Sequence, residues 1–176
     1  MSMQKLLIVV DMQNDFIDGA LGTKEAEAIV SGVVEQIRSF DGVVLATLDT
    51  HEENYMSTAE GAKLPVAHCI RGTTGWELHP QVQEALDEKK GETLEKPTFG
   101  SVQLPVWIRD RFNPDELEIT LVGLCTDICV VSNALLLKAH FPETPIAVIS
   151  SLCAGVTPDA HQAALSTMRS CQIDVL

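Results

Sequence analysis

Apolar positions along the chain form continuous runs that alternate with helically spaced positions. Four long runs have almost no polar interruption, as is typical of strands buried on both faces of a sheet, and they cover 5–10, 42–49, 117–124 and 145–152. Between them, apolar residues recur every three or four positions, which predicts amphipathic helices over 25–40, 79–90, 102–112, 127–141 and 158–171. Two shorter strands are predicted at 92–96 and 173–176.

This alternation predicts an α/β fold, a three-layer sandwich in which helices flank both faces of a mostly parallel central sheet. At 176 residues, the chain suits one domain over 1–176. The stretch 50–78 shows no clear period, and an irregular segment of that length inside a compact domain is usually functional.

Polar residues at the predicted strand ends are candidate site residues, because ligands of such sheets bind beyond the carboxyl ends of the strands. Asp11 follows the first strand, Asp49 and His51 the second, and Lys96 the short third one. The segment 125–129 follows the strand over 117–124. The fold can gather these groups although they are far apart in the sequence.

Composition narrows the class of function. The formal net charge is −13, from 25 acidic and 12 basic residues, and such a field repels phosphate backbones, so nucleic acid is not an expected partner. The apolar run before Asp11 is too short for a signal peptide or a membrane span. Five cysteines, an odd number, lie in or beside apolar runs, which favours reduced thiols and a cytoplasmic protein.

Cys125 and Cys129 lie four residues apart, where a strand is predicted to end and a helix to begin. A structural zinc site needs a second cysteine pair, which the other, isolated cysteines do not supply. Burial as a small apolar residue is the alternative, and it is favoured for Cys125. Cys129 falls in the first turn of the predicted helix, after Thr126 and Asp127, either of which suits a helix cap.

Cys129 is therefore a candidate nucleophile. A helix N-terminus lowers the pKa of a thiol, and its N–H groups can hold an oxyanion. A nucleophilic thiol also needs a base and a nearby positive charge, and Asp11 and Lys96 supply both if the fold brings them together. The alternative is an ordinary surface pair of an acid and a lysine.

Asp49, His51 and His68 form a second candidate constellation. An Asp-x-His pair at a strand end and a histidine in the long loop offer one carboxylate and two imidazoles, which suit a divalent metal with open positions. The alternative is a capped strand end and an unrelated loop histidine. The remaining histidines are predicted to lie on helix surfaces: His79, His140 and His161.

Three motifs together resemble the isochorismatase-like cysteine hydrolases: "VVDMQNDF" at 9–16, "LEKPTFGS" at 94–101 and "GLCTDICV" at 123–130. The resemblance covers nearly the whole chain and implies a Rossmann-like sandwich. It implies a catalytic triad of Asp11, Lys96 and Cys129. It also implies a cis peptide before Cys125, and an oxyanion hole made by the backbone N–H groups of Cys125 and Cys129.

The metal motif resembles the nicotinamidase branch of this family, because "HCIRGTTG" at 68–75 matches its pattern of a histidine followed by C-x-x-G-T-x-G. By this resemblance Asp49, His51 and His68 bind a divalent metal, commonly zinc, with manganese or iron as alternatives. In that branch the metal holds the pyridine nitrogen of nicotinamide.

Phe16 and Phe99 are candidates to flank the aromatic ring of such a substrate. The chain departs from the branch at Thr50, where a tryptophan is usual, and in "KPTFGS" at 96–101, where Lys-Gly is frequent. These departures bear on the substrate rather than on the hydrolytic chemistry.

The sequence thus predicts a cysteine hydrolase that cleaves a small amide through a thioester, with nicotinamide as the predicted substrate and nicotinate and ammonia as products. One alternative is hydrolysis of another small amide or of an N-carbamoyl compound. A second is isochorismate hydrolysis, which family members without the cysteine perform. A third is a catalytically silent metal-binding protein. The expected partner is a small-molecule amide, with no nucleic acid and no membrane. The apolar helix at 129–141 indicates either subunit contacts or core packing, and a homo-oligomer is expected.

Overall fold

The structure, a computed structural model, describes residues 3–176 and has a six-stranded sheet in the order β3-β2-β1-β4-β5-β6. All neighbouring strands pair in parallel. The strands are β1 (Gln4–Val10), β2 (Val43–Asp49), β3 (Glu92–Lys96), β4 (Leu117–Leu124), β5 (Ile146–Ala154) and β6 (Asp174–Val175). The predicted α/β fold with a parallel sheet is confirmed.

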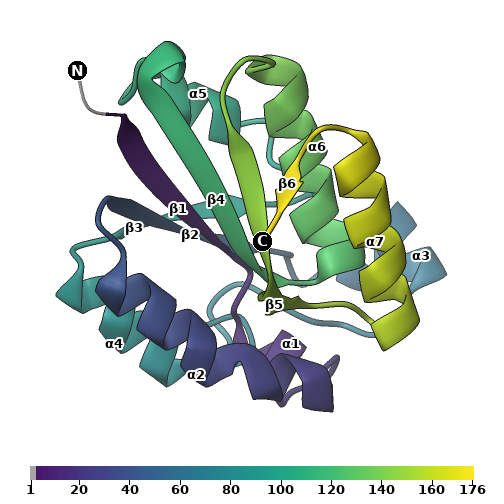
Figure 1. Cartoon of the computed structure of the whole chain (residues 1–176). Helices are drawn as coiled ribbons and strands as arrows, with labels where there is room; N and C mark the ends of the chain where they lie inside the picture. Colours follow the sequence, from purple (N-terminus) through teal and green to yellow (C-terminus); the bar gives the residue numbers. More distant parts are fainter. Residues whose placement is uncertain (1–2) are drawn as a thin grey trace.

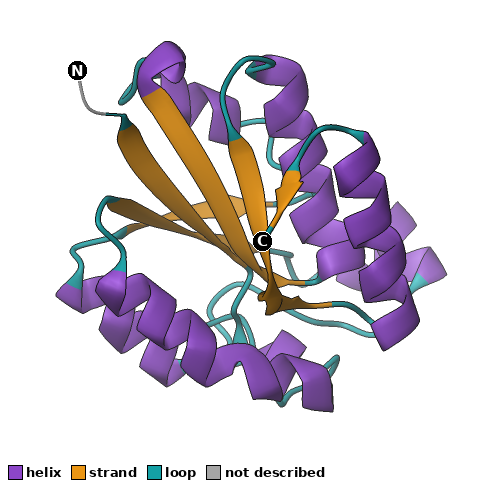
Figure 2. Cartoon of the chain, in the orientation of Figure 1, coloured by secondary structure: helices purple, strands orange, loops and turns teal. Residues whose placement is uncertain are grey.

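Helices cover both faces of this sheet (Figure 1). On one face lie α2 (Lys24–Ser39) and α4 (Pro80–Glu88), with the short α1 (Asn14–Ile17) beside α2. On the other lie α5 (Leu104–Arg109), α6 (Val131–His140) and α7 (Pro158–Ser170). Figure 2 shows the resulting three layers, with the strands between two sets of helices. A further short helix, α3 (Ala59–Lys63), belongs to the long segment after β2.

The continuous apolar runs form strands because both of their faces are covered. In β1, Leu6 and Ile8 pack into the core beneath α5, α6 and α7, whereas Leu7 and Val9 pack into the core beneath α2 and α4. Full burial of one such side chain contributes about 1.5–3 kcal/mol of transfer free energy. A polar residue at any of the five buried positions of β1, Leu6–Val10, would therefore face one apolar layer or the other.

The strand order places a switch point between β1 and β4. From β1 the chain continues to β2 and β3 on one side, and β4, β5 and β6 lie on the other. Loops leaving the carboxyl ends of β1 and β4 diverge there, which opens a crevice in sheets of this type. The predicted site residues follow the strands nearest this point.

The segment 50–78 is less irregular than its sequence indicates. It contains α3 and a 3₁₀ turn at Tyr55–Ser57, neither of which the sequence predicts. The short helix α1, in the segment after β1, is likewise not predicted. Thr58 caps α3, because its hydroxyl accepts a hydrogen bond from Gly61 N at 3.0 Å. Among residues 3–176, no helix is both long and apolar enough to cross a membrane.

Candidate active site and metal site

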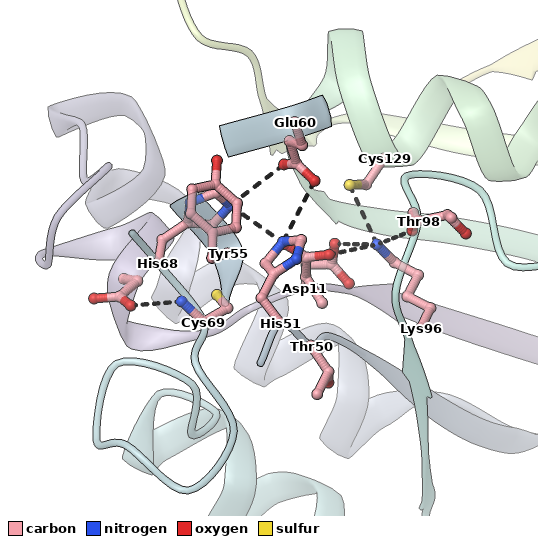
Figure 3. Close-up of polar contacts among 12 residues, drawn as sticks. Asp11, Thr50, His51, Tyr55, Glu60, His68, Cys69, Lys96, Thr98 and Cys129 are labelled. Atoms are coloured by element: carbon pink, nitrogen blue, oxygen red, sulfur yellow. Dashed lines mark hydrogen bonds and ion pairs between the residues drawn. The ribbon is translucent and has the colours of Figure 1, made fainter. Parts of the chain in front are cut away.

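The side chains of Asp11, Lys96 and Cys129 meet beyond the carboxyl ends of β1, β3 and β4 (Figure 3). Lys96 Nζ lies 2.7 Å from Asp11 Oδ2 and 3.3 Å from Cys129 Sγ. The ammonium group also donates to Thr98 O at 3.2 Å and lies 3.7 Å from Asp49 Oδ1. Asp11 and Lys96 are 0% exposed and Cys129 is 4% exposed. The three predicted residues are therefore in contact, and they are not a surface ion pair.

Asp11 is held in place by the neighbouring strand β2. The Thr47 hydroxyl donates to Asp11 Oδ1 at 2.6 Å, and Asp11 N donates to Thr47 O at 3.2 Å. Asp11 has a φ of 48°, in the left-handed region, which is unfavourable for most residues other than glycine. This conformation ends the strand and turns the carboxylate toward Lys96.

Electrostatics at this cluster differ from the sequence-based expectation. Burial raises the pKa of the Cys129 thiol well above its ordinary value, and the Asp11 carboxylate raises it further, while Lys96 opposes both effects. The expected lowering of this pKa by a helix N-terminus is therefore wrong. Cys129 rests as a neutral thiol beside a carboxylate that can take its proton.

The other two groups of the cluster have shifted pKa values as well. Burial raises the pKa of Asp11, although the Lys96 ammonium opposes this. Burial by itself lowers the pKa of Lys96, but the negative charges of Asp11 and Asp49 raise it above its ordinary value. Lys96 therefore stays an ammonium, and Asp11 becomes a better proton acceptor than an exposed aspartate.

The turn that carries Cys129 is π-helical over Thr126–Val130 and runs into α6. Neither predicted cap acts as one. The Thr126 hydroxyl bonds to His161 Nδ1 at 2.7 Å, and Asp127 Oδ1 accepts from Val156 N at 3.0 Å. His161 is accordingly half-buried and joined to this turn, and it is not a free surface histidine. Single π-helical turns occur frequently at functional sites.

The peptide bond between Leu124 and Cys125 is cis, as the family resemblance implies. Cys125 is half-buried and packs against the core beneath α2, as favoured from the sequence. Burial raises the pKa of its thiol to about 12. Within residues 3–176, no cysteine belongs to a group of candidate metal ligands, so the alternative of a cysteine-bound zinc is not supported.

Asp49, His51 and His68 form such a group, because one ligand atom from each lies within 4.8 Å of the others. Asp49 Oδ2 is 3.0 Å from His51 Nε2 and 3.5 Å from His68 Nε2, and all three residues are buried. His68 Nδ1 bonds to Val66 O at 2.8 Å, which leaves Nε2 as the ligating nitrogen.

These residues fit a divalent metal. Asp49 Oδ1 is buried without a hydrogen-bond partner, and the set of one carboxylate and two imidazoles suits zinc, manganese or iron. Burial alone would raise the pKa of Asp49, but hydrogen bonds with His51 and His68 hold it well below its ordinary value. The carboxylate is therefore ionised, as a ligand must be.

Glu60, on α3, is a residue of this site that the sequence did not reveal. Its carboxylate oxygens lie 3.6 Å from His51 Nε2 and 3.7 Å from His68 Nε2, and Figure 3 shows it facing both imidazoles. The only sequence signal is Thr58 as a possible helix cap, which would have placed Glu60 in a first helical turn.

Gln13 is a second residue whose role the sequence did not reveal, and it holds Asp49 of the candidate metal site in place. Its carboxamide accepts from Asp49 N and donates to Asp49 O, both at 2.8 Å, and it also donates to Trp76 O at 2.8 Å. The Trp76 indole N–H in turn donates to the Thr50 hydroxyl at 2.9 Å. Thr50, which departs from the usual sequence of the branch, thus joins β2 to the loop that carries His68.

The two phenylalanines predicted to flank a substrate ring differ in position. Phe16 is buried on α1, and its ring centroid lies 5.5 Å from that of His68, at an interplanar angle of 58°. Phe99 follows β3 and is 45% exposed. Phe16 therefore lies beside the candidate metal site of Asp49, His51 and His68. The role of Phe99 stays a prediction.

The sequence matches the Isochorismatase domain family over residues 5–176, and the chain belongs to this family. It is 30% identical to the nicotinamidase/pyrazinamidase of Mycobacterium tuberculosis over 188 residues, an alignment that covers 98% of each chain. The resemblance inferred from the three motifs is thus confirmed.

Solved structures agree with this assignment. The fold is similar to that of nicotinamidase PncA from Bacillus subtilis, with a TM-score of 0.85, 28% identity, and coverage of 98% of this chain and 99% of that one. It is also similar to the pyrazinamidase of Pyrococcus horikoshii crystallised in complex with zinc, with a TM-score of 0.79, 26% identity and coverage of 98% of each chain.

Proposed function

We propose that this protein is an amidase that hydrolyses nicotinamide to nicotinate and ammonia through a thioester on Cys129. The contact of a buried lysine with both a carboxylate and a thiol carries the proposal, because that arrangement can ionise the thiol by an internal proton transfer. The names of the similar proteins from Mycobacterium tuberculosis and Bacillus subtilis support the choice of substrate.

In the proposed reaction, Asp11 takes the proton of the Cys129 thiol, and the sulfur attacks the amide carbonyl. This transfer neutralises the charge of Asp11, which was raising the thiol pKa, while Lys96 remains to stabilise the thiolate. Asp11 then gives the proton to the departing ammonia, and water hydrolyses the thioester. General acid–base help of this kind typically accelerates a reaction by about 10²–10⁴-fold.

Backbone N–H groups of Cys125 and Cys129 are the proposed oxyanion hole. They stand at the start and within the π-helical turn, where the carbonyl oxygen of a substrate attacked by Cys129 would develop negative charge. One such donor typically lowers the barrier by about 3 kcal/mol.

Asp49, His51 and His68 are the proposed ligands of a divalent metal, with zinc as the first candidate, since the Pyrococcus horikoshii pyrazinamidase was crystallised with zinc. When bound, such an ion supplies a Lewis acid that can hold a ring nitrogen of the substrate. Phe16 is the proposed apolar wall against one face of that ring, and Phe99 a second wall.

Cys129→Ala tests the proposed nucleophile. We expect it to abolish ammonia release from nicotinamide while leaving the melting temperature within a few degrees of the parent, since the side chain is small. Cys171→Ala, which removes an exposed cysteine far along the chain, is the matched control and should retain full activity. Hydrolysis of nicotinamide by Cys129→Ala at the parental rate would refute the assignment.

A second candidate is the hydrolysis of another small amide or of an N-carbamoyl compound by the same groups. Thr50 and the sequence after Lys96 favour keeping this candidate, since they differ from the usual pattern of the branch. Ammonia release from a panel of such amides decides between the two. Presence of the cysteine argues against isochorismate hydrolysis, and the assembled cluster argues against a silent metal-binding protein.

We propose in addition that the chain is a single domain over 1–176, acts in the cytoplasm without nucleic-acid or membrane partners, and forms a homo-oligomer. The net charge of −13 supports the absence of nucleic acid. Two exposed apolar side chains are suited to subunit contacts, Val106 on α5 and Val102 just before it. Light scattering of the purified protein tests the assembly.

A further inference from the structure

Asn133 is a fully buried polar residue on α6, one turn after Cys129. Its Nδ2 donates to Cys129 O at 2.8 Å and to Phe99 O at 3.1 Å, and its Oδ1 accepts from Ser101 N at 2.8 Å. All three partners are backbone groups. These partners fix the orientation of the carboxamide, because its oxygen must accept from a backbone N–H and its nitrogen must donate to two backbone carbonyls.

These hydrogen bonds join two segments that the proposed reaction needs together. One is the turn that carries the nucleophile, and the other is the loop 97–101 that follows Lys96. This loop also contacts the lysine directly, since Lys96 Nζ donates to Thr98 O. Close packing accompanies the hydrogen bonds, because a Cβ atom on Gly100 would lie 3.3 Å from Ser132 O.

We propose that Asn133 is a positioning residue that sets the distance between the Lys96 ammonium and the Cys129 sulfur. By binding the backbone of Phe99 and Ser101, it fixes the loop that begins after Lys96 and with it the Thr98 carbonyl, which is one of the acceptors that orient the ammonium. This inference rests on the proposed function, in which Lys96 stabilises the thiolate of Cys129. Without the carboxamide, the loop moves away from α6 and the ammonium recedes from the sulfur.

Two substitutions separate the contacts of Asn133. Asn133→Ala removes all of them. Asn133→Thr removes both hydrogen bonds to the loop, but its hydroxyl can still reach the carbonyl four residues earlier in the helix, at Cys129. Asn133→Thr therefore keeps the helix contact and provides a folded test protein if Asn133→Ala is unstable.

The measurement is the rate of alkylation of Cys129 by iodoacetate relative to iodoacetamide, followed by mass spectrometry of the peptide. The two reagents have similar size, so a change in access affects both rates equally, whereas a nearby ammonium favours the anionic reagent. We expect the ratio to fall by up to about tenfold in both variants, the factor for an ammonium that recedes by about 2 Å at an effective dielectric constant of about 20. The value of kcat for nicotinamide should fall about tenfold with little change in KM.

Thr144→Val is the control for a merely structural effect. Thr144 is buried and donates to Pro114 O at 2.8 Å, and it lies before the amino end of β5, away from the site. Its loss should lower the melting temperature but leave the reagent ratio and kcat unchanged. An unchanged ratio in Asn133→Thr would overturn the proposal. If the ratio falls but the parent protein hydrolyses no nicotinamide, the positioning role stands and the proposed substrate fails.

Discussion

Asp11→Asn should make Cys129 more reactive toward an alkylating reagent while it destroys turnover. The Asp11 carboxylate and the Cys129 sulfur both contact Lys96, at 2.7 and 3.3 Å, so they lie within about 6 Å of each other. At that separation and an effective dielectric constant of about 20, a carboxylate and a thiolate repel each other by about 3 kcal/mol, or about 100-fold in an equilibrium constant. The substitution removes this repulsion and leaves Lys96 in place.

The pKa of Cys129 should therefore fall, and the thiolate fraction should rise by up to about 100-fold at a pH below both pKa values. A thiolate of lower pKa is a weaker nucleophile, with a Brønsted coefficient of about 0.4–0.5, so the net gain in alkylation rate is about tenfold. Turnover should fall by about 10²–10⁴-fold, because Asn cannot carry the proton from the thiol to ammonia.

The assay is alkylation with iodoacetamide at mildly alkaline pH, with the rate at Cys129 divided by that at the exposed Cys171 in the same molecule. Asn is isosteric with Asp, and its single oxygen can accept from the Thr47 hydroxyl or from the Lys96 ammonium. Asp18→Asn, which removes a charge from an exposed position in the same segment, is the matched control. Slower alkylation of Cys129 in Asp11→Asn would refute the reasoning, because the carboxylate would then assist ionisation of the resting thiol more than it opposes it.

Further substitutions test other contacts. Thr47→Val removes a hydrogen bond that favours the ionised form of Asp11, so the pKa of Asp11 should rise. The acid limb of the kcat/KM profile should then move to higher pH by about half a unit to one unit. A shift to lower pH would contradict this. Glu60→Gln should weaken zinc binding by about tenfold, measured by competition with a chelator, and an unchanged affinity would exclude Glu60 from the metal site. Ile8→Ala should lower the free energy of unfolding by about 2–5 kcal/mol in urea titrations, and a loss under 1 kcal/mol would show that the covered sheet is not the main core.

Much of the fold was predictable because its signals are local. Strands buried on both faces must be continuously apolar, so β1 and β4 are visible in the sequence, and β3 ends at Lys96 as predicted. Candidate site residues followed from one rule, that ligands bind at the carboxyl ends of parallel strands. That rule points to Asp11, Asp49 and Lys96 from the sequence alone.

The features that the sequence did not reveal depend on neighbours that are distant along the chain. The direction of the Cys129 pKa shift is set by burial and by Asp11, and neither is visible in the local motif. Thr126 has the chemistry of a helix cap, but its hydroxyl bonds to His161 on α7 instead. Glu60 joins the imidazoles only because the chain after β2 turns so that α3 brings this carboxylate back to His51 and His68, which no period in that stretch indicates.

The groups of the site are divided unevenly between the two sides of the switch point in the sheet. The acid, the lysine and the candidate metal ligands all belong to β1, β2, β3 and the segments between them, whereas the turn after β4 carries the sulfur. During synthesis, Asp11 and Lys96 are therefore incorporated before Cys129. A polypeptide cut between β3 and β4 would carry the acid and the lysine in one piece and the thiol in the other, so the cluster would form only after the two pieces were rejoined.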